Sequence, residues 1–346
     1  MDNYEHDDFS RNRTANEIEI NEGKTILETK PQAMIVMLSN RCNIDCIMCG
    51  VKNQKWDLPK KTIEEIVKYL PYLEYIQWQG GEVFLLDYFK DLFQEAARNP
   101  NLRQIINTNG LLISKEWARV IANAQADITF SIDGVTKGVY EAIRKGAGFE
   151  DLLQCIRRIN EVKRNDSKIK TSMNVVVMNS NYKQLGQFVD FAHEHQFDSL
   201  TLFRIDDNFD GEQNIFHHDN KFAESYIKAV LPEMWKKAHG YGIRLTSYLY
   251  PDNNSNMQQD PVRDTNRGML CYLPWREFTV DVMGTRPDCR CPISAGNIFE
   301  SSLPDIWNGS VMQEYRKRIL RNECVGFCRS ECIQGVIPEK ALKGEL

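Results

Sequence analysis

Three cysteines lie close together in the segment SNRCNIDCIMCG, with the spacing C-x3-C-x2-C. Cys42, Cys46 and Cys49 can therefore present three thiolates on one tight loop. Cysteine thiolates are the usual ligands of iron–sulfur clusters, and three of them can hold three irons of a [4Fe–4S] cube. The fourth iron would keep an open position for a small chelating ligand, which is what a catalytic metal site needs.

Two other interpretations of this segment stay open. A structural zinc site usually has four ligands, often as paired C-x2-C units, and the next cysteine along the chain is the distant Cys155. Three unrelated buried cysteines are the second alternative. The spacing favours the iron–sulfur cluster over both. Cys155 itself shares a helical face with Leu152, Ile156 and Ile159, which indicates core packing.

The composition is that of a globular protein in a reducing compartment. The chain has 346 residues, 42% hydrophobic and 26% charged, enough for a sizeable core and about two domains. Its net charge of −5 lacks the basic footprint of nucleic-acid binding. No run approaches the ~18–20 apolar residues that span a bilayer, and the acidic amino terminus has no secretory signal. We therefore expect a cytoplasmic protein without nucleic-acid or membrane partners, whose cysteines bind metal more often than they form disulfides.

Strand-like and helix-like segments alternate about six times between Ala33 and Leu231. Strands are predicted at Ala33–Ser39, at Leu73–Gln79 and at LRQIIN, DITFSI, KTSMNVVVM and SLTLFRI, each followed by a helix-length segment. Such alternation predicts an α/β fold with parallel strands and crossover helices. A doubly wound sheet and a full or partial TIM-like barrel both satisfy this pattern.

The chain divides into three parts by composition. Residues 1–32 form a polar arm that we predict to be irregular, and residues 33–250 carry the alternating pattern. A polar, proline-containing stretch follows. A small α+β domain is then predicted over 264–337, where short strands and turns accompany most of the remaining cysteines.

Four short motifs lie at the ends of the second, third, fourth and sixth predicted strands, and active sites of parallel barrels lie at those strand ends. They are QGGE (Gln79–Glu82), NTNG (Asn107–Gly110), SIDG (Ser131–Gly134) and FRI (Phe203–Ile205). Together with SNRCNIDCIMCG, these motifs resemble those of radical S-adenosylmethionine (radical SAM) enzymes, in the same order. The resemblance implies a partial (β/α)6 barrel in which SAM chelates the open iron. It also implies reductive cleavage of SAM to a 5′-deoxyadenosyl radical, which abstracts a substrate hydrogen atom.

The resemblance also assigns roles to residues. Cys42, Cys46, Cys49 and Glu82 are the expected catalytic set, with Glu82 accepting hydrogen bonds from the SAM ammonium group. Arg144 is the expected partner of the SAM carboxylate. Val83 departs from the family, which often has proline there. The expected cofactor-binding residues are Gly80, Gly81, Glu82, Asn109, Ser131, Asp133, Arg144 and Phe203.

A second cysteine group has the spacing C-x17-C-x-C, then a long gap and C-x3-C-x3-C. It resembles the SPASM and twitch extensions of radical SAM enzymes, which carry auxiliary [4Fe–4S] clusters, although the full C-x2-C-x5-C-x3-C run is missing. Ten cysteines suffice for the SAM cluster and one four-thiolate cluster, but not for a third. We therefore expect one auxiliary cluster, and a zinc knuckle is the alternative. The expected ligands are Cys271, Cys289, Cys324 and Cys328, with Cys291 and Cys332 as alternates.

The resemblance predicts C–H activation, followed by oxidation, epimerisation or crosslinking of a carbohydrate-type metabolite or a peptide. About 32 residues precede the barrel, too few for a precursor-binding domain, which favours a small metabolite or a directly bound peptide. A reductant such as flavodoxin or ferredoxin is expected as a partner. The competing hypothesis is a zinc-stabilised scaffold or binding protein without radical chemistry, which the acidic charge and the GGE segment disfavour.

Overall fold

The computed structural model describes residues 6–50, 55–165, 168–205, 211–216, 220–250, 271–281, 284–286 and 294–321. Within them, one nine-stranded sheet has the order β11-β10-β1-β3-β4-β5-β7-β8-β9. All neighbouring strands are parallel except β11, which is antiparallel to β10. The strands are β1 (Ala33–Met37), β3 (Tyr75–Gln79), β4 (Arg103–Thr108), β5 (Asp127–Ser131), β7 (Thr171–Val177), β8 (Ser199–Arg204), β9 (Arg244–Ser247), β10 (Glu277–Asp281) and β11 (Gly284–Arg286).

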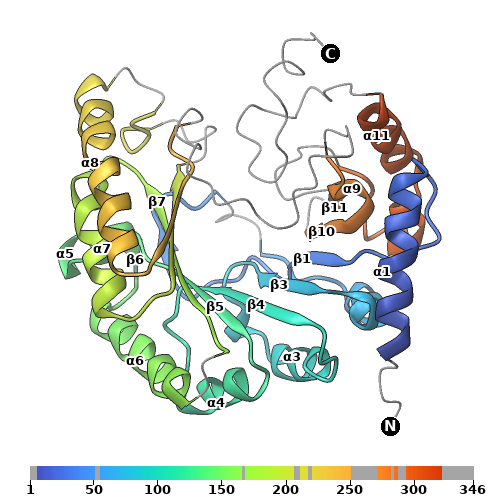
Figure 1. Cartoon of the computed structure of the whole chain (residues 1–346). Coiled ribbons are helices and arrows are strands. Elements are labelled where there is room, and N and C mark those ends of the chain that lie inside the picture. Colours follow the sequence, from blue (N-terminus) through green and yellow to red (C-terminus); the bar gives the residue numbers. More distant parts are fainter. Residues whose placement is uncertain are drawn as a thin grey trace.

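The sheet curves into an open arc, and its crossover helices lie on the outer side (Figure 1). This confirms the predicted α/β partial barrel and all six predicted strands; β9 adds a further parallel strand beyond β8. None of the helices in the described part of the chain has the length and apolar character needed to cross a bilayer. The helices are α1 (His6–Asn21), α2 (Lys60–Tyr69), α3 (Phe89–Ala96), α4 (Lys115–Asn123), α5 (Lys137–Ile143), α6 (Phe149–Asn165), α7 (Leu185–Glu194), α8 (Lys221–Gly240), α9 (Leu273–Arg276), α10 (Leu303–Trp307) and α11 (Ser310–Leu320).

The two faces of the sheet differ in burial. In β3, Ile76 and Trp78 are fully buried, whereas Tyr75, Gln77 and Gln79 are only half-buried. Because successive side chains of a strand point to opposite faces, this alternation separates an apolar outer face from a more accessible inner face. The same alternation runs along β7. The apolar outer face packs under the crossover helices and forms the main core.

The amino-terminal arm is not irregular, and that prediction is wrong for its first half. Residues His6–Asn21 form α1, although the helix has no apolar stripe. Apart from Ile20, the side chains that the structure shows buried in α1 are polar, and distant groups satisfy them. Asn16 Nδ2 lies 2.8 Å from Trp275 O and 3.0 Å from Thr29 Oγ1. Asn16 Oδ1 accepts a hydrogen bond from Gln32 Nε2 at 3.0 Å. Periodicity cannot reveal a helix that is stabilised in this way.

The carboxy-terminal segment continues the sheet of the barrel. Strand β10 pairs in parallel with β1, with Ala33 opposite Glu277 and Val36 opposite Val280. The arm and α11 lie side by side at one edge of the molecule (Figure 1), and Arg316 Nη1 donates to Thr25 O at 2.9 Å. The division into a barrel and an extension at residue 264 stays a prediction, because residues 251–270 lie outside the described part of the chain.

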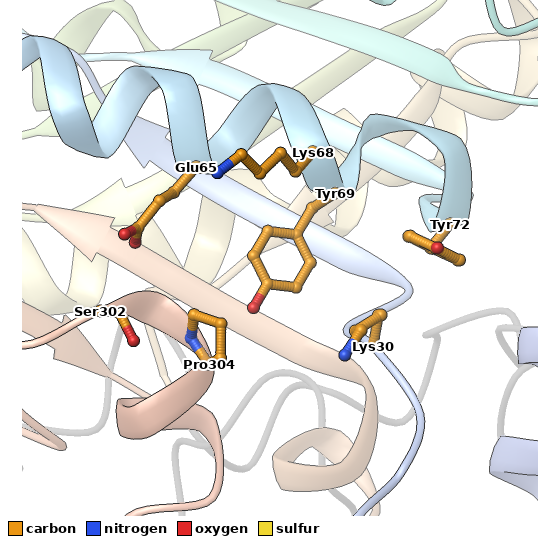
Figure 2. A pocket seen from close by; sticks show the side chains of 7 residues that line it. All are labelled: Lys30, Glu65, Lys68, Tyr69, Tyr72, Ser302 and Pro304. Carbon is orange, nitrogen blue, oxygen red and sulfur yellow. The ribbon is translucent and has the colours of Figure 1, made fainter.

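A cavity of about 280 Å³ lies between α2 and the segment that leads into α10 (Figure 2). Lys30, Lys68 and Glu65 are among the residues that line it, and Glu65 Oε2 accepts a hydrogen bond from Leu303 N at 2.8 Å. The Tyr69 hydroxyl is buried there and has no hydrogen-bond partner in the part of the chain that the structure describes. We interpret this cavity as part of the interface between the barrel and the carboxy-terminal helices.

The polar contacts of α1 predict a measurable stability effect. We expect Asn16→Ala to lower the free energy of unfolding by about 2 kcal/mol, because Trp275 O and the Gln32 amide would lose a buried partner. Urea denaturation followed by tryptophan fluorescence measures this change. Asn21→Ala at the exposed end of the same helix is the control and should stay within about 0.5 kcal/mol of the wild type. Equal stabilities of the two variants would contradict this account of the arm.

Candidate active site

The cysteine loop begins directly after β1 and is held against the turn that follows β3. Leu38 N donates to Gln79 O at 2.9 Å, Gly81 N to Ser39 O at 2.7 Å, and Glu82 N to Arg41 O at 2.8 Å. These three backbone hydrogen bonds join the QGGE motif to the residues just before Cys42. The parallel register of β1 and β3 places both segments at the same edge of the sheet.

Close backbone approach explains the two glycines of this motif. A Cβ atom on Gly80 would lie 2.3 Å from Ser39 O, and one on Gly81 would lie 2.1 Å from Arg41 O. Gly80 also has φ of +148°, a conformation that side chains disfavour. A residue with a side chain at either position would push the cysteine loop away from the turn.

A second anchor holds the middle of the cysteine loop. Strand β2 (Asp45–Cys46) pairs antiparallel with β6 (Arg144–Lys145), so that Cys46 lies opposite Arg144. Ile47 N donates to Ile143 O at 2.9 Å and extends this contact. The loop is therefore fixed both to the end of β3 and to the segment after α5.

The three cysteines of the loop are thiols that can serve as ligands. Cys42 and Cys49 are exposed and Cys46 is half-buried, and none forms a disulfide. Burial raises the pKa of Cys46 to about 11; nearby Arg144 lowers it, and the charges of Cys42 and Cys49 raise it further. Each thiol therefore lies within electrostatic range of the others, and a proton must leave when a metal binds.

This arrangement fits an iron–sulfur cube. Within the described residues, no three Cys, His, Asp or Glu side chains converge closely enough to bind a single metal ion. A [4Fe–4S] cube binds each thiolate through a different iron, so its ligands need not converge on one point. Three neighbouring thiols on a loop with two backbone anchors supply the donor set of such a cube.

Glu82 lies at the end of the QGGE motif and is almost completely buried, with 1% exposure. Thr108 Oγ1 lies 2.8 and 2.9 Å from its two oxygens, and Asn109 N donates to Oε2 at 2.8 Å. Burial raises the pKa of Glu82 to about 7, although these hydrogen bonds oppose the shift. The carboxyl group thus joins the ends of β3 and β4.

Asn109 connects the end of β4 to the cysteine loop. Its Nδ2 lies 2.8 Å from Asn43 Oδ1 and 3.7 Å from Cys42 Sγ. The residue is 4% exposed, and its Oδ1 accepts a hydrogen bond from Leu111 N at 3.0 Å, which orients the amide toward the loop. Sequence reasoning missed Thr108 and Asn43 as partners in this network. Thr108 stands in the NTNG motif and Asn43 in the cysteine segment, but only their spatial neighbours reveal their roles.

Arg144 and Asp133 form a buried ion pair. Arg144 Nη2 lies 2.6 Å from Asp133 Oδ2, and both side chains are at most 6% exposed. Burial raises the pKa of Asp133 and the guanidinium opposes that shift. Arginine stays charged in proteins, so we treat the pair as ionised. Arg144, the expected partner of the SAM carboxylate, is thus paired in this structure with the carboxylate of Asp133.

The two remaining predicted cofactor-binding residues lie at strand ends. Ser131 ends β5, with Asn174 of β7 as its neighbour in register. Phe203 lies near the end of β8, and its ring stacks on Tyr248 with centroids 5.4 Å apart. Both are half-buried on the inner side of the sheet. Cys155 is buried in the main core, at 2% exposure, as predicted.

One member of the second cysteine group lies in the described part of the chain. Cys271 is half-buried just before α9 and packs against the main core. The other predicted ligands of an auxiliary cluster lie outside the described residues: Cys289, Cys291, Cys324, Cys328 and Cys332.

Amide and hydroxyl side chains line the inner face of the sheet. Asn107 Nδ2 lies 3.3 Å and Gln77 Nε2 lies 3.0 Å from Gln79 Oε1. The register continues this face across the neighbouring strands. Its further polar members include Thr129, Ser131, Ser172, Asn174 and Thr201.

Comparison with protein families gives two matches. The model of the radical SAM superfamily matches residues 36–192, and the SPASM model, an iron–sulfur cluster-binding domain, matches residues 271–333. The chain therefore carries a radical SAM domain followed by a SPASM-type extension. The predicted SPASM-type extension is confirmed by the second match, and SAM and [4Fe–4S] clusters are the cofactors of these two domains.

Several relatives of this radical SAM protein are maturases. It is 27% identical over 161 residues to the mycofactocin maturase MftC of Mycolicibacterium smegmatis, covering 45% of this chain and 40% of that one. It is 21% identical over 334 residues to a cysteine-type anaerobic sulfatase-maturating enzyme of Clostridium novyi, covering 86% and 87%. The chain spans about half of the length of several other curated relatives. The crystal structure of Streptococcus suis SuiB shares the fold, with a TM-score of 0.65, 16% identity and coverage of 89% and 72%.

The packing of the glycine turn leads to a prediction for this radical SAM protein. We expect Gly81→Ala to bind clearly less iron than the wild type after anaerobic reconstitution, with the loss confined to the cysteine loop, because its Cβ would collide with Arg41 O. Iron and acid-labile sulfide analysis measures this loss. Gly138→Ala is the control, since nothing lies within 4 Å of its Cβ position in α5, and it should bind iron normally. Full iron loading of Gly81→Ala would contradict the proposed contact.

Proposed function

We propose that this protein uses SAM and a reduced [4Fe–4S] cluster to abstract a hydrogen atom from a C–H bond of a peptide. The observation that carries the proposal is the doubly anchored loop of Cys42, Cys46 and Cys49 beside the glycine turn of β3. When bound, the two cofactors supply a carbon-centred radical derived from SAM. The three thiolates hold the cluster at the edge of the sheet where the four motifs meet.

The residues around the loop have distinct proposed tasks. Gly80 and Gly81 let the backbone of the cysteine loop lie directly against the turn after β3, and Glu82 provides a negative charge for the SAM ammonium group. Asn109 fixes the loop through Asn43, and Phe203 offers an aromatic surface near the end of β8. We place Ser131 in the same SAM site because it ends the neighbouring strand β5.

A peptide is the substrate class that the comparisons favour. SuiB has been crystallised with SAM and with its precursor peptide SuiA, and other relatives are named maturases. The inner face of the sheet supports this choice, because its amide and hydroxyl groups can hydrogen-bond to a peptide backbone. A carbohydrate-type metabolite could use the same donors and is the second candidate. A small electron-transfer protein such as flavodoxin or ferredoxin is the proposed reductant.

The second cysteine group is proposed to hold one auxiliary [4Fe–4S] cluster, which would take up an electron from the substrate radical. This proposal predicts the iron content of a protein with Cys42, Cys46 and Cys49 all changed to alanine. We expect about four irons to remain per chain after anaerobic reconstitution, against about eight in the wild type. The same triple variant should form no 5′-deoxyadenosine from SAM under reducing conditions.

Two comparisons make this experiment decisive. Cys155→Ala, which removes a buried thiol of the core, should retain the wild-type iron content. A triple variant without iron, next to a wild type with about four, would overturn the auxiliary cluster. Zinc in place of iron in the wild type would favour the scaffold hypothesis instead.

The burial of Glu82 predicts a pH dependence of SAM binding. The pKa of Glu82 is about 7, so the group is increasingly protonated and neutral as the pH falls below 7. An ammonium group prefers the ionised carboxylate, and we expect SAM to bind about tenfold more weakly at pH 6 than at pH 8. Calorimetric titration measures this ratio. Glu82→Gln should lose most of the dependence, whereas Glu74→Gln, at an exposed position just before β3, should keep it.

A further inference from the structure

The ion pair between Asp133 and Arg144 lies beside the cysteine loop, in the interior of the protein. Its Nη2–Oδ2 distance is 2.6 Å, and the two side chains are 0% and 6% exposed. Asp133 is itself fixed, because Val176 N donates to its Oδ1 at 2.7 Å and Asn181 Nδ2 donates to its carbonyl oxygen at 2.9 Å. The carboxylate therefore has one orientation, set by the ends of β5 and β7.

A buried ion pair of this kind is not explained by stability alone. Taking two charges out of water is costly, and well-packed apolar side chains of similar volume often stabilise a protein as much or more. Arg144 Nε is also buried, and no hydrogen-bond partner for it lies among the described residues. A role of the Arg144 guanidinium in holding another group of the site in place would explain why the protein keeps this buried ion pair.

The guanidinium reaches the sulfur of Cys46. Arg144 Nη1 lies 3.8 Å from Cys46 Sγ, within hydrogen-bonding range for sulfur. The pairing of β2 with β6 fixes the two backbones opposite each other, and the bond from Ile47 N to Ile143 O locks the register. Both the backbone and the charged tip of Arg144 are therefore directed at this one cysteine.

We propose that Asp133 and Arg144 are positioning residues that place an N–H donor and a positive charge on the Cys46 thiolate of the SAM cluster. Hydrogen bonds to cluster sulfurs and nearby net charge set the reduction potential of an iron–sulfur cluster. A guanidinium beside Cys46 stabilises the more negative, reduced form and makes the cluster easier to reduce. This inference rests on the proposed function, because it takes Cys46 as a cluster ligand.

The inference differs from a role of Arg144 in holding the SAM carboxylate. In the structure Nη2 contacts Asp133 and Nη1 contacts Cys46, so two of its three nitrogens have partners within the chain. A carboxylate-binding role predicts weaker SAM binding and an unchanged potential when SAM is absent. A positioning role predicts a shifted potential without SAM.

The test is a potentiometric titration of the SAM cluster in the reconstituted full-length protein, followed by electron paramagnetic resonance without SAM. The signal of this cluster is the one missing from the Cys42/Cys46/Cys49→Ala protein. We expect Arg144→Gln to shift the potential to a more negative value and Arg144→Lys, which keeps the charge, to restore part of the shift. Lys145→Gln, an exposed neighbour in β6, is the matched control and should show no shift.

Asp133→Asn gives the sharpest result because two effects have opposite signs. Removing a negative charge near the cluster would by itself raise the potential. Loss of the anchor that directs the guanidinium at Cys46 would lower it, and we expect the lower value. A raised or unchanged potential in Asp133→Asn overturns the inference, as does an unchanged potential in Arg144→Gln.

Stability and iron content separate this inference from the proposed function. A wild type without iron in the loop would overturn the proposed function, and the inference with it. If Arg144→Gln does not fold, Asp133→Asn and Arg144→Lys still decide, because a normal potential in both would show that the pair only supports the fold. Weaker SAM binding together with an unchanged potential would assign Arg144 to the SAM carboxylate.

Discussion

Close backbone contact between two loops is the constraint on which the site depends. Strands β1 and β3 are parallel and in register, so the segments that follow them leave the sheet at the same edge. Gly80 and Gly81 carry no Cβ, which allows Ser39 and Arg41 to approach within hydrogen-bonding distance of that turn. The position of Cys42, the burial of Glu82 and the contact of Asn109 with the loop all follow from this contact. A displaced turn would move each of them.

The site also brings three buried charged side chains close to the cysteine loop. Glu82 is enclosed by the ends of β3 and β4, and Asp133 and Arg144 form an ion pair between the end of β5 and β6. Each of these groups costs stability relative to a well-packed apolar side chain. Their shared property is that each fixes the geometry of a strand end or of the cysteine loop. The three buried charged side chains thus favour a rigid site over the most stable packing of the core.

The extension and the barrel are less separate than composition indicates. Strand β10 continues the sheet beyond β1, and Trp307 Nε1 donates to Thr29 O in the amino-terminal arm at 2.9 Å. Arg316 is fully buried, donates to Pro274 O and Thr25 O, and lies over the Trp307 ring. These contacts fix the segment that carries Cys271 to the barrel. The arm thus connects both ends of the chain through polar contacts.

The sequence alone predicted the alternation of strands and helices and the cysteine spacings, because these are local properties. The partial-barrel class, the SPASM-type extension and the cofactors followed from the resemblance of its motifs to those of radical SAM enzymes. The sequence also showed the motifs that meet at the strand ends. Only the tertiary structure decided which atoms those residues contact. Arg144 pairs with Asp133 and Cys46, Asn109 contacts the cysteine loop, and α1 is a helix held by buried polar groups. These outcomes depend on partners that are distant in sequence, and a burial pattern set by such partners leaves no periodic signal.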